Sequence, residues 1–162
     1  TLYQDGCALL LSKSCYEKIG AFDEWLWTYS EESDLCTRAH LAGFRVCCLQ
    51  KAKIWHKVST TLGTYYERKP HAEYYGVRNN YIFHRRYAGS WLNRLLSILI
   101  LLSRTPRRFA SIAIKGKNSR FQNLWMLIAA TLIGITTNSR RPSDAFAPIK
   151  AVKNRIEHSK AL

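Results

Sequence analysis

The segment from Tyr29 to Phe44 constrains the fold most, because it carries signals for both ends of one short helix. Ser30 has a side chain suited to an N-cap, and Gly43 stands where helices commonly stop in a left-handed conformation. Between them, apolar residues recur at i, i+4 and i+7 on one helix face: Leu35, Ala39 and Ala42. The segment therefore predicts a helix that begins after Ser30 and ends at Gly43.

Glu31, Glu32 and Asp34 fall in the first turn of this predicted helix. The helix dipole favours negative charge there, so we expect all three carboxylates to be ionised, as a general base or a cation site requires. The alternative is ordinary charge at a helix start, with Asp34 paired to Arg38 at i, i+4.

The segments on either side predict a mixed architecture. Residues 3–11 are largely apolar and read as a buried strand, and residues 12–19 read as a short helix. Residues 44–48 and 54–58 alternate between apolar and other side chains, which is the period of a strand.

Two aromatic features carry open alternatives. Trp25, Trp27 and Tyr29 directly precede the carboxylates and could form the platform of a sugar site, or could be core residues, since aromatic side chains bury large areas. His56 shares a predicted strand face with apolar neighbours. It is either a core histidine or a metal ligand.

The positive charge lies entirely in the second half. Residues 1–73 hold nine Lys/Arg and nine Asp/Glu, whereas residues 74–162 hold sixteen and two, which accounts for the formal net charge of +14. Residues 95–102 and 124–135 are apolar runs, both shorter than the roughly 20 residues that a spanning helix needs. Basic residues lie between the runs: Arg104, Arg107, Arg108, Lys115, Lys117 and Arg120.

This pattern predicts helices that lie in the interface of an anionic membrane. The alternative is a hairpin of buried helices. We exclude nucleic acid as a partner, because the arginines flank apolar runs and no recognition motif occurs.

The five cysteines form no CxxC pair and suggest neither a disulfide framework nor a zinc site. Amid apolar residues they suit buried free thiols in a reducing compartment. With no signal peptide in the sequence, we expect a cytoplasmic protein, peripheral on the inner face of the cell membrane.

Six sequence blocks together resemble the C-terminal, acceptor-side half of family 2 (GT-A type) glycosyltransferases, in particular the rhamnosyltransferase-like members. In chain order the blocks are 6–10, 18–24, 31–39, 43–45, 54–59 and 74–79. The resemblance covers residues 2–87. It implies that residues 1–87 form part of a GT-A fold of the α/β class, and that residues 88–162 form basic, amphipathic, membrane-associating helices.

The resemblance implies an inverting transfer of a sugar from a nucleotide-diphospho-sugar donor to a glycan or lipid-linked acceptor, in cell-surface polysaccharide biosynthesis. Glu32 matches the family's general base, where Asp is usual; an ionised carboxylate there can take the proton of the acceptor hydroxyl. His56 matches a histidine that helps to bind Mg²⁺ or Mn²⁺ at the diphosphate, where the cation acts as a Lewis acid.

Further residues match the acceptor side of the family's site. The matches in the strand-loop and in the aromatic stretch are Gly6, Cys7, Ala8, Trp25 and Trp27. Glu31 and Asp34 are expected to orient the acceptor or to hold the helix start.

The family's nucleotide-binding half has no counterpart here, since the sequence contains no Asp-x-Asp motif and no glycine-rich phosphate loop. We therefore expect the chain alone to bind nucleotide sugar poorly. The alternative function is a non-catalytic, basic membrane-binding or interaction module left by truncation of such an enzyme.

Overall fold

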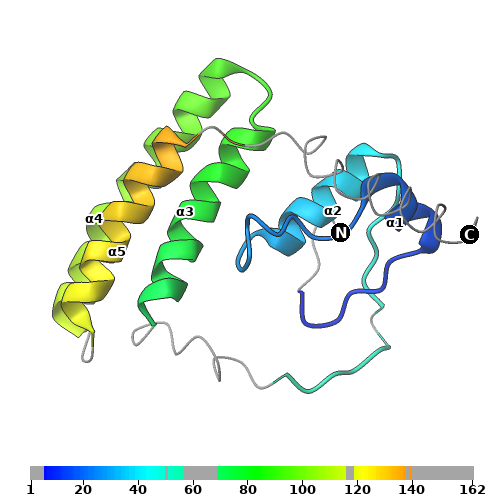
Figure 1. Cartoon of the computed structure of the whole chain (residues 1–162), viewed down its shortest axis with the longest axis horizontal. Helices are drawn as coiled ribbons and strands as arrows, with labels where there is room; N and C mark the ends of the chain where they lie inside the picture. Colours follow the sequence, from blue (N-terminus) through cyan, green and yellow to red (C-terminus); the bar gives the residue numbers. More distant parts are fainter. Residues whose placement is uncertain (1–5, 50, 57–68, 116–118, 138, 140–162) are drawn as a thin grey trace, which may run out of the picture. The chain divides into compact units, whose positions relative to one another are not determined.

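The computed structural model describes residues 6–49, 51–56, 69–115, 119–137 and 139, and within them it holds five helices and no β-strand. The helices are α1 (Lys13–Ile19), α2 (Glu31–Leu41), α3 (Pro70–Tyr87), α4 (Trp91–Lys115) and α5 (Arg120–Thr136). The chain divides into two compact units (Figure 1). The first contains α1 and α2; the second contains residues 25–30 and α3, α4 and α5.

Helix α1 begins and ends as its sequence predicts. Ser12 has the extended backbone of an N-cap, and its hydroxyl oxygen accepts a hydrogen bond from the backbone N–H of Cys15 at 3.2 Å. Gly20 follows the helix with φ 76°, a value that glycine adopts without steric cost.

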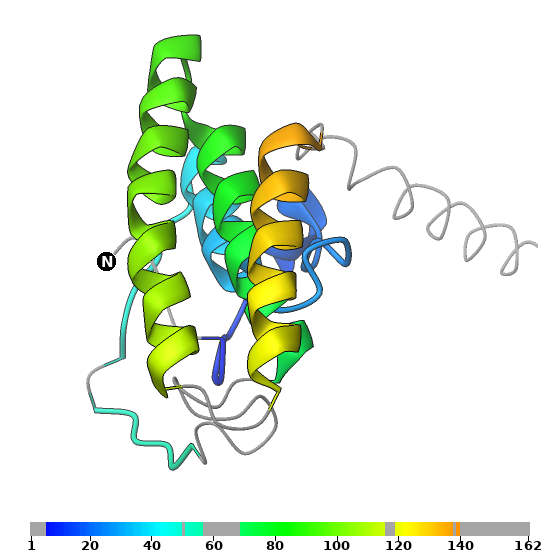
Figure 2. The ribbon, with the colours of Figure 1, turned by 90° about the vertical axis from the view of Figure 1, so that its left-hand side faces the viewer.

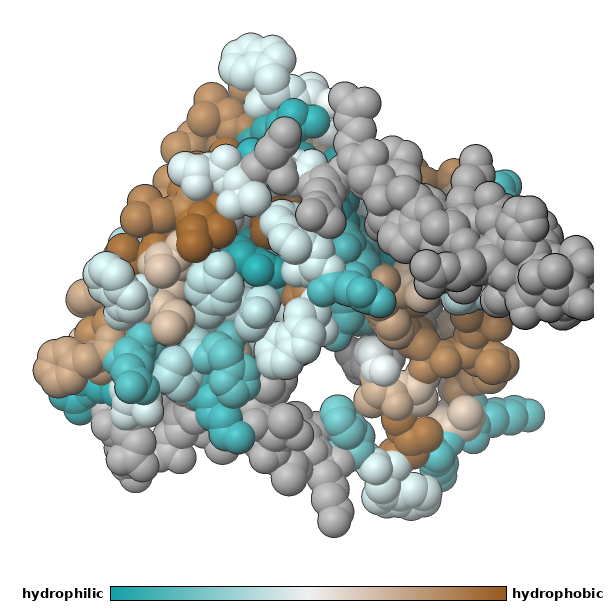
Figure 3. Space-filling model, in the orientation of Figure 1, coloured by the Kyte–Doolittle hydropathy of each residue, from teal (hydrophilic) through white to brown (hydrophobic). Residues whose placement is uncertain are grey.

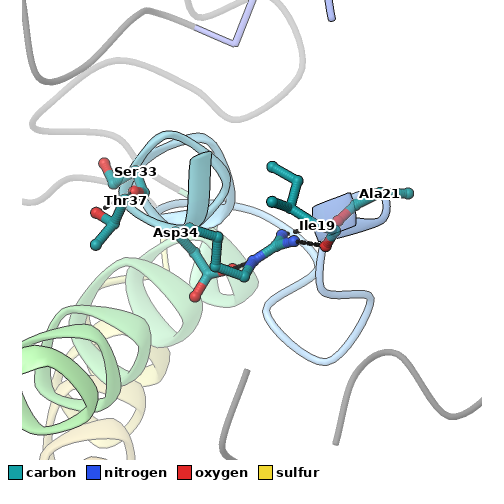
Figure 4. A network of polar contacts seen from close by, with 6 residues as sticks. Ile19, Ala21, Ser33, Asp34 and Thr37 are labelled. Atoms are coloured by element: carbon teal, nitrogen blue, oxygen red, sulfur yellow. Dashed lines mark hydrogen bonds and ion pairs between the residues drawn. The ribbon is translucent and has the colours of Figure 1, made fainter. Parts of the chain in front are cut away.

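The first unit is held together by apolar contacts between α1 and α2 and by one buried ion pair. Its buried apolar residues are Cys15, Ile19, Leu35 and Ala39. Arg38 donates from Nε to Asp34 at 2.7 Å, and from Nη1 and Nη2 to the carbonyl oxygens of Ile19 at 2.5 Å and Ala21 at 2.8 Å. Figure 4 shows Asp34, Ile19 and Ala21 around this guanidinium. The i, i+4 pairing of Asp34 with Arg38 is thus confirmed, and it ties the start of α2 to the end of α1.

The start of α2 differs from its prediction in one respect. The helix begins at Glu31, as expected, but Ser30 has φ 65°. An N-cap residue normally has an extended backbone, so the N-cap predicted for Ser30 is wrong.

The second unit is a three-helix arrangement in which α3 and α5 run in the same direction and α4 runs antiparallel to both (Figures 1 and 2). Helices α3 and α5 approach closely at Gly134, where a Cβ would lie 2.8 Å from Cβ of Tyr81 and 3.1 Å from the carbonyl oxygen of Arg78. Only a residue without a side chain fits there.

Two further polar contacts fix this unit. The fully buried carboxylate of Glu73 on α3 accepts from Nε of Arg108 on α4 at 2.9 Å and from its Nη2 at 2.5 Å. Arg85 of α3 donates to the carbonyl oxygens of Gly134 and Thr137, at the end of α5. The three helices are therefore tied together at both ends of α3.

The expected α/β fold, with a partial GT-A sheet, is wrong for the described part of the chain. Residues 6–11, 44–49 and 52–56 form no ladder of hydrogen bonds with one another. Alternating side chains make a segment fit to join a sheet, but a strand exists only when another segment takes up its N–H and C=O groups. These segments have the alternating side chains of strands, but among the described residues no segment pairs with them.

Helix α4 continues through Pro106 to Lys115, beyond the apolar run of residues 95–102. The expectation that the cysteines are buried is wrong in part. Of the five free cysteines, Cys15 and Cys36 are buried as expected, but Cys7, Cys47 and Cys48 are exposed. Within the described residues no helix combines the length and hydrophobicity needed to span a bilayer.

We predict that Asp34→Asn lowers the free energy of unfolding by about 3 kcal/mol, because it leaves the buried guanidinium of Arg38 without its counter-charge. Urea unfolding followed by circular dichroism measures this loss. Glu17→Gln is the matched control, since it removes the exposed Lys13–Glu17 pair at 3.9 Å and should change stability little. Equal stability of the two variants would show that the buried pair contributes nothing.

Candidate functional site

The first unit carries one candidate site, a pair of carboxyl groups on neighbouring residues of the first turn of α2, Glu31 and Glu32. Both side chains are half-buried. One carboxyl oxygen of Glu31, Oε2, is buried and has no hydrogen-bond partner among the described residues. The pKa of Glu31 is raised from 4.5 to about 7, mainly because burial desolvates the carboxylate; a backbone hydrogen bond opposes the rise, and the charge and hydrogen bond of Glu32 add to it.

The pair therefore holds a proton at a pH where an exposed glutamate has lost it. The expectation that the helix dipole keeps every carboxylate of this turn ionised is wrong for Glu31 below about pH 7. Burial and a like charge on the next residue outweigh the dipole, which contributes less than about 1 kcal/mol at such a position.

Gly6 lies beside Glu32 in the first unit. A Cβ added to Gly6 would be 3.6 Å from Cβ of Glu32, which is ordinary van der Waals contact. Cys7 and Ala8 follow, and both are exposed. The fold thus brings the predicted site residue Gly6 next to the predicted base, whereas the Asp34 side chain is fully buried and bonded to Arg38.

The second unit carries a separate candidate binding feature, the aromatic loop, which we define as residues 25–30. Trp27, Tyr29 and Ser30 all have positive φ, between 60° and 65°. Non-glycine residues in this region cost of order 1 kcal/mol each, so the loop needs support from its surroundings.

Asn79 of α3 supplies that support. Its Nδ2 group donates to the carbonyl oxygens of Leu26 at 2.6 Å, Thr28 at 2.7 Å and Tyr29 at 2.9 Å. Two hydrogens are shared among three acceptors, and the side chain is fully buried. One amide therefore fixes most of the backbone of the aromatic loop.

Arg78, the preceding residue, holds the same loop from its other end. Its Nη2 donates to the carbonyl oxygen of Trp25 at 2.7 Å, and its Nε donates to Oδ1 of Asn79 at 2.8 Å. The guanidinium lies 4.7–5.5 Å from the ring centroids of Trp25, Tyr74 and Tyr75, within cation–π range.

Trp27 points outward from the aromatic loop. Its side chain is 59% exposed, so the core alternative is wrong for this residue. Its ring lies 4.7 Å from that of Tyr75 and 6.0 Å from that of His71, centroid to centroid. Three rings from the loop and from the first two turns of α3 thus form an accessible aromatic surface.

His56 is exposed, so the core alternative is wrong for it as well. It belongs to the second unit, whereas Glu32 belongs to the first. Among the described residues, no three His, Cys, Asp or Glu side chains cluster as metal ligands. The residues described here therefore do not by themselves form a divalent-cation site.

Sequence reasoning assigned no role to Arg78 and Asn79, although both fall in one of the resembling blocks. The signal was an adjacent Arg–Asn pair in the middle of an otherwise aromatic helix. Such long polar side chains on a packed helix need carbonyl partners, and the aromatic loop provides them.

No protein-family model matches the chain, and neither a curated protein nor a solved structure matches it.

We predict that Asn79→Ala releases the aromatic loop. Three carbonyl oxygens, one in a buried and two in partly buried hydrogen bonds, lose their donor, so amides of residues 25–30 should exchange with deuterium at least tenfold faster, and stability should fall by about 1–3 kcal/mol. Exposed Asn80 provides the matched control, because Asn80→Ala removes the same group from the next position of α3. Equal exchange in both variants would contradict the role assigned to Asn79.

We predict that Glu31 makes the first unit less stable as the pH rises from about 4.5 to about 7. Within this window Glu31 keeps its proton in the folded state and has released it in the unfolded state. The free energy of unfolding therefore falls as the pH rises. Glu31→Gln stays neutral and should remove this decline, whereas Glu17→Gln should retain it. Urea unfolding at a series of pH values checks the difference, and a decline that persists in Glu31→Gln would refute it.

Proposed function

We propose that this chain supplies the acceptor-binding and proton-accepting residues of an inverting glycosyltransferase, which uses a nucleotide-diphospho-sugar donor and a glycan or lipid-linked acceptor. The Glu31–Glu32 pair carries the proposal. It combines two carboxyl groups at a helix start, a pKa of about 7 for Glu31, and a neighbouring glycine in place of a bulkier residue.

In the proposed reaction Glu32 accepts the proton of the acceptor hydroxyl while that oxygen forms a bond to the anomeric carbon of the donor. The bond from the anomeric carbon to the diphosphate breaks on the opposite face, which inverts the configuration. Below about pH 7 a protonated Glu31 donates a hydrogen bond to Glu32 and competes with the acceptor hydroxyl for it. We therefore expect transfer to accelerate as the pH rises through about 7.

The aromatic surface of Trp27, His71 and Tyr75 suits the acceptor. The apolar face of a pyranose stacks on an exposed ring, and a tryptophan provides the largest such area. Asn79 fixes the backbone beneath Trp27, so the ring is presented without a large loss of loop entropy on binding.

The divalent cation remains a prediction based on the resemblance. His56 would be one ligand to Mg²⁺ or Mn²⁺, and the described residues supply no second and third ligand beside it. We therefore derive no step through a metal ion from this chain.

The alternative, a non-catalytic membrane-binding module, is favoured by the apolar residues that α4 and α5 expose. It predicts neither binding of glycan at Trp27 nor transfer dependent on Glu32. These two properties therefore separate the two functions.

We predict that Glu32→Gln lowers transfer at least about a hundredfold, because an amide cannot accept the hydroxyl proton. The assay uses the chain fused behind the nucleotide-binding half of a family 2 rhamnosyltransferase, with loss of donor sugar and gain of glycosylated acceptor as readouts. Glu17→Gln is the control for charge, since that carboxylate is exposed on α1. An unchanged rate in the Glu32 variant would refute the assignment of the base.

The same assay tests the aromatic surface. Trp27→Ala should raise the acceptor KM at least fivefold with a smaller effect on kcat, since stacking binds ground and transition states alike. Trp55→Ala removes another exposed tryptophan of the second unit and should leave both constants unchanged. A fusion that transfers no sugar would favour the non-catalytic alternative.

A further inference from the structure

Helix α4 turns its apolar side outward. Its exposed large apolar residues are Trp91, Leu92, Leu95, Leu96, Leu99, Ile100, Leu102, Phe109 and Ile114. Only Leu101 and Ile112 among its large apolar side chains are buried. A helix on the surface of a globular unit normally faces the core with its apolar stripe, so α4 has the reverse orientation.

Helix α5 likewise exposes large apolar side chains and buries mainly small or polar ones. Its outward row, at i, i+4, i+7 and i+11, consists of Phe121, Trp125, Ile128 and Leu132, all exposed. Its buried residues are mainly small or polar: Asn123, Leu127, Ala130, Thr131 and Gly134. The close approach to α3 at Gly134 explains this choice, because small residues let the helices approach and leave the large side chains outside.

The two helices lie side by side and antiparallel on one side of the second unit (Figure 2). In Figure 3 apolar side chains gather along the left-hand edge, where α4 and α5 lie in Figure 1. We call this surface the α4–α5 outer face. Contiguous apolar surface of this extent is rare on a soluble protein without a binding partner.

Charge indicates what the outer face binds. The sequence contains no Asp or Glu between Glu73 and Asp144, so no carboxylate lies on α4 or α5. On α4 the exposed Arg104 and Arg107 lie at one edge of the apolar stripe by the 100° step of a helix, whereas the exposed Arg94 lies on the side of the buried Leu101. Cationic side chains at the edge of an apolar stripe, with no carboxylate on the helix, are typical of helices that bind an anionic lipid surface.

We propose that the α4–α5 outer face lies in the interface of an anionic membrane, with both helices parallel to the membrane plane. Within the described residues no helix is suited to span the bilayer, and α4, at roughly 37 Å for 25 residues, can lie flat along its whole length. Exposed Trp91 and Trp125 have the amphipathic rings that settle at headgroup level. The inference does not depend on the proposed glycosyl transfer, which is tested by a separate assay.

Vesicle sedimentation of the full chain tests the proposal. Binding to vesicles of phosphatidylcholine with phosphatidylglycerol should exceed binding to phosphatidylcholine alone. The double substitution Leu99→Glu with Ile128→Glu places one carboxylate on each exposed apolar row and should weaken binding at least tenfold. Asn80→Glu with Gln122→Glu adds the same charge at exposed positions outside the two rows and serves as the matched control.

A second variant separates lipid charge from apolar contact. Arg104→Gln with Arg107→Gln should reduce the preference for anionic vesicles about fivefold for each arginine, and should leave binding to neutral vesicles unchanged. In the unsubstituted chain, brominated lipid should quench tryptophan emission, and Trp91→Phe with Trp125→Phe should abolish that quenching. This measurement needs no variant with an added charge.

Three outcomes would overturn the proposal: absence of binding to either kind of vesicle, equal binding by the glutamate variant and its control, or quenching that persists without Trp91 and Trp125. A concentration-dependent dimer that the glutamate substitutions dissociate, without vesicle binding, would instead identify a second copy of the chain as the occupant.

Discussion

Both units depend on side chains that donate hydrogen bonds to backbone carbonyl groups. Within the described residues no sheet pairs these groups, and a buried carbonyl without a donor lowers the stability of the fold. In the first unit Arg38 donates to the carbonyls of Ile19 and Ala21. In the second, Asn79 donates to three carbonyls of the aromatic loop, and Arg85 donates to two at the end of α5. These side chains supply the hydrogen bonds that a neighbouring strand supplies in a sheet. Each polar residue fixes the backbone segment to which it donates.

This constraint links fold to candidate chemistry within each unit. The Arg38–Asp34 pair consumes one of the three carboxylates at the start of α2 and fixes the helix that carries the other two. Glu31 and Glu32 are adjacent and half-buried, and burial, with a smaller contribution from Glu32, raises the pKa of Glu31 to about 7. Asp34, held by Arg38, and Glu31, with its raised pKa, thus differ in role because their surroundings differ, although they lie within four residues.

Features that depend on residues close in sequence could be predicted, whereas features that depend on distant residues could not. Ser12, Gly20 and the carboxylates of residues 31–34 act within one helical turn, so α1 and α2 were found with nearly correct bounds. The strands failed because alternation is local and pairing is not. Asn79 escaped notice because its three acceptors lie about fifty residues earlier, and the raised pKa of Glu31 because burial cannot be read from residue order.

The apolar residues of the second half were recognised in the sequence, but their direction required the structure. Residues 95–102 predict a helix equally well whether its apolar side faces a core or a membrane. Direction is decided by what α3 can accommodate: at Gly134 it leaves no room for a Cβ, and at Glu73 it binds the guanidinium of Arg108. Since α3 takes small side chains from α5 and a charged one from α4, most of the large apolar residues of both helices are excluded from the interior. The exposure of these apolar residues follows from the shape and polarity of α3. Contact with a lipid surface removes the free-energy cost of exposing them to water.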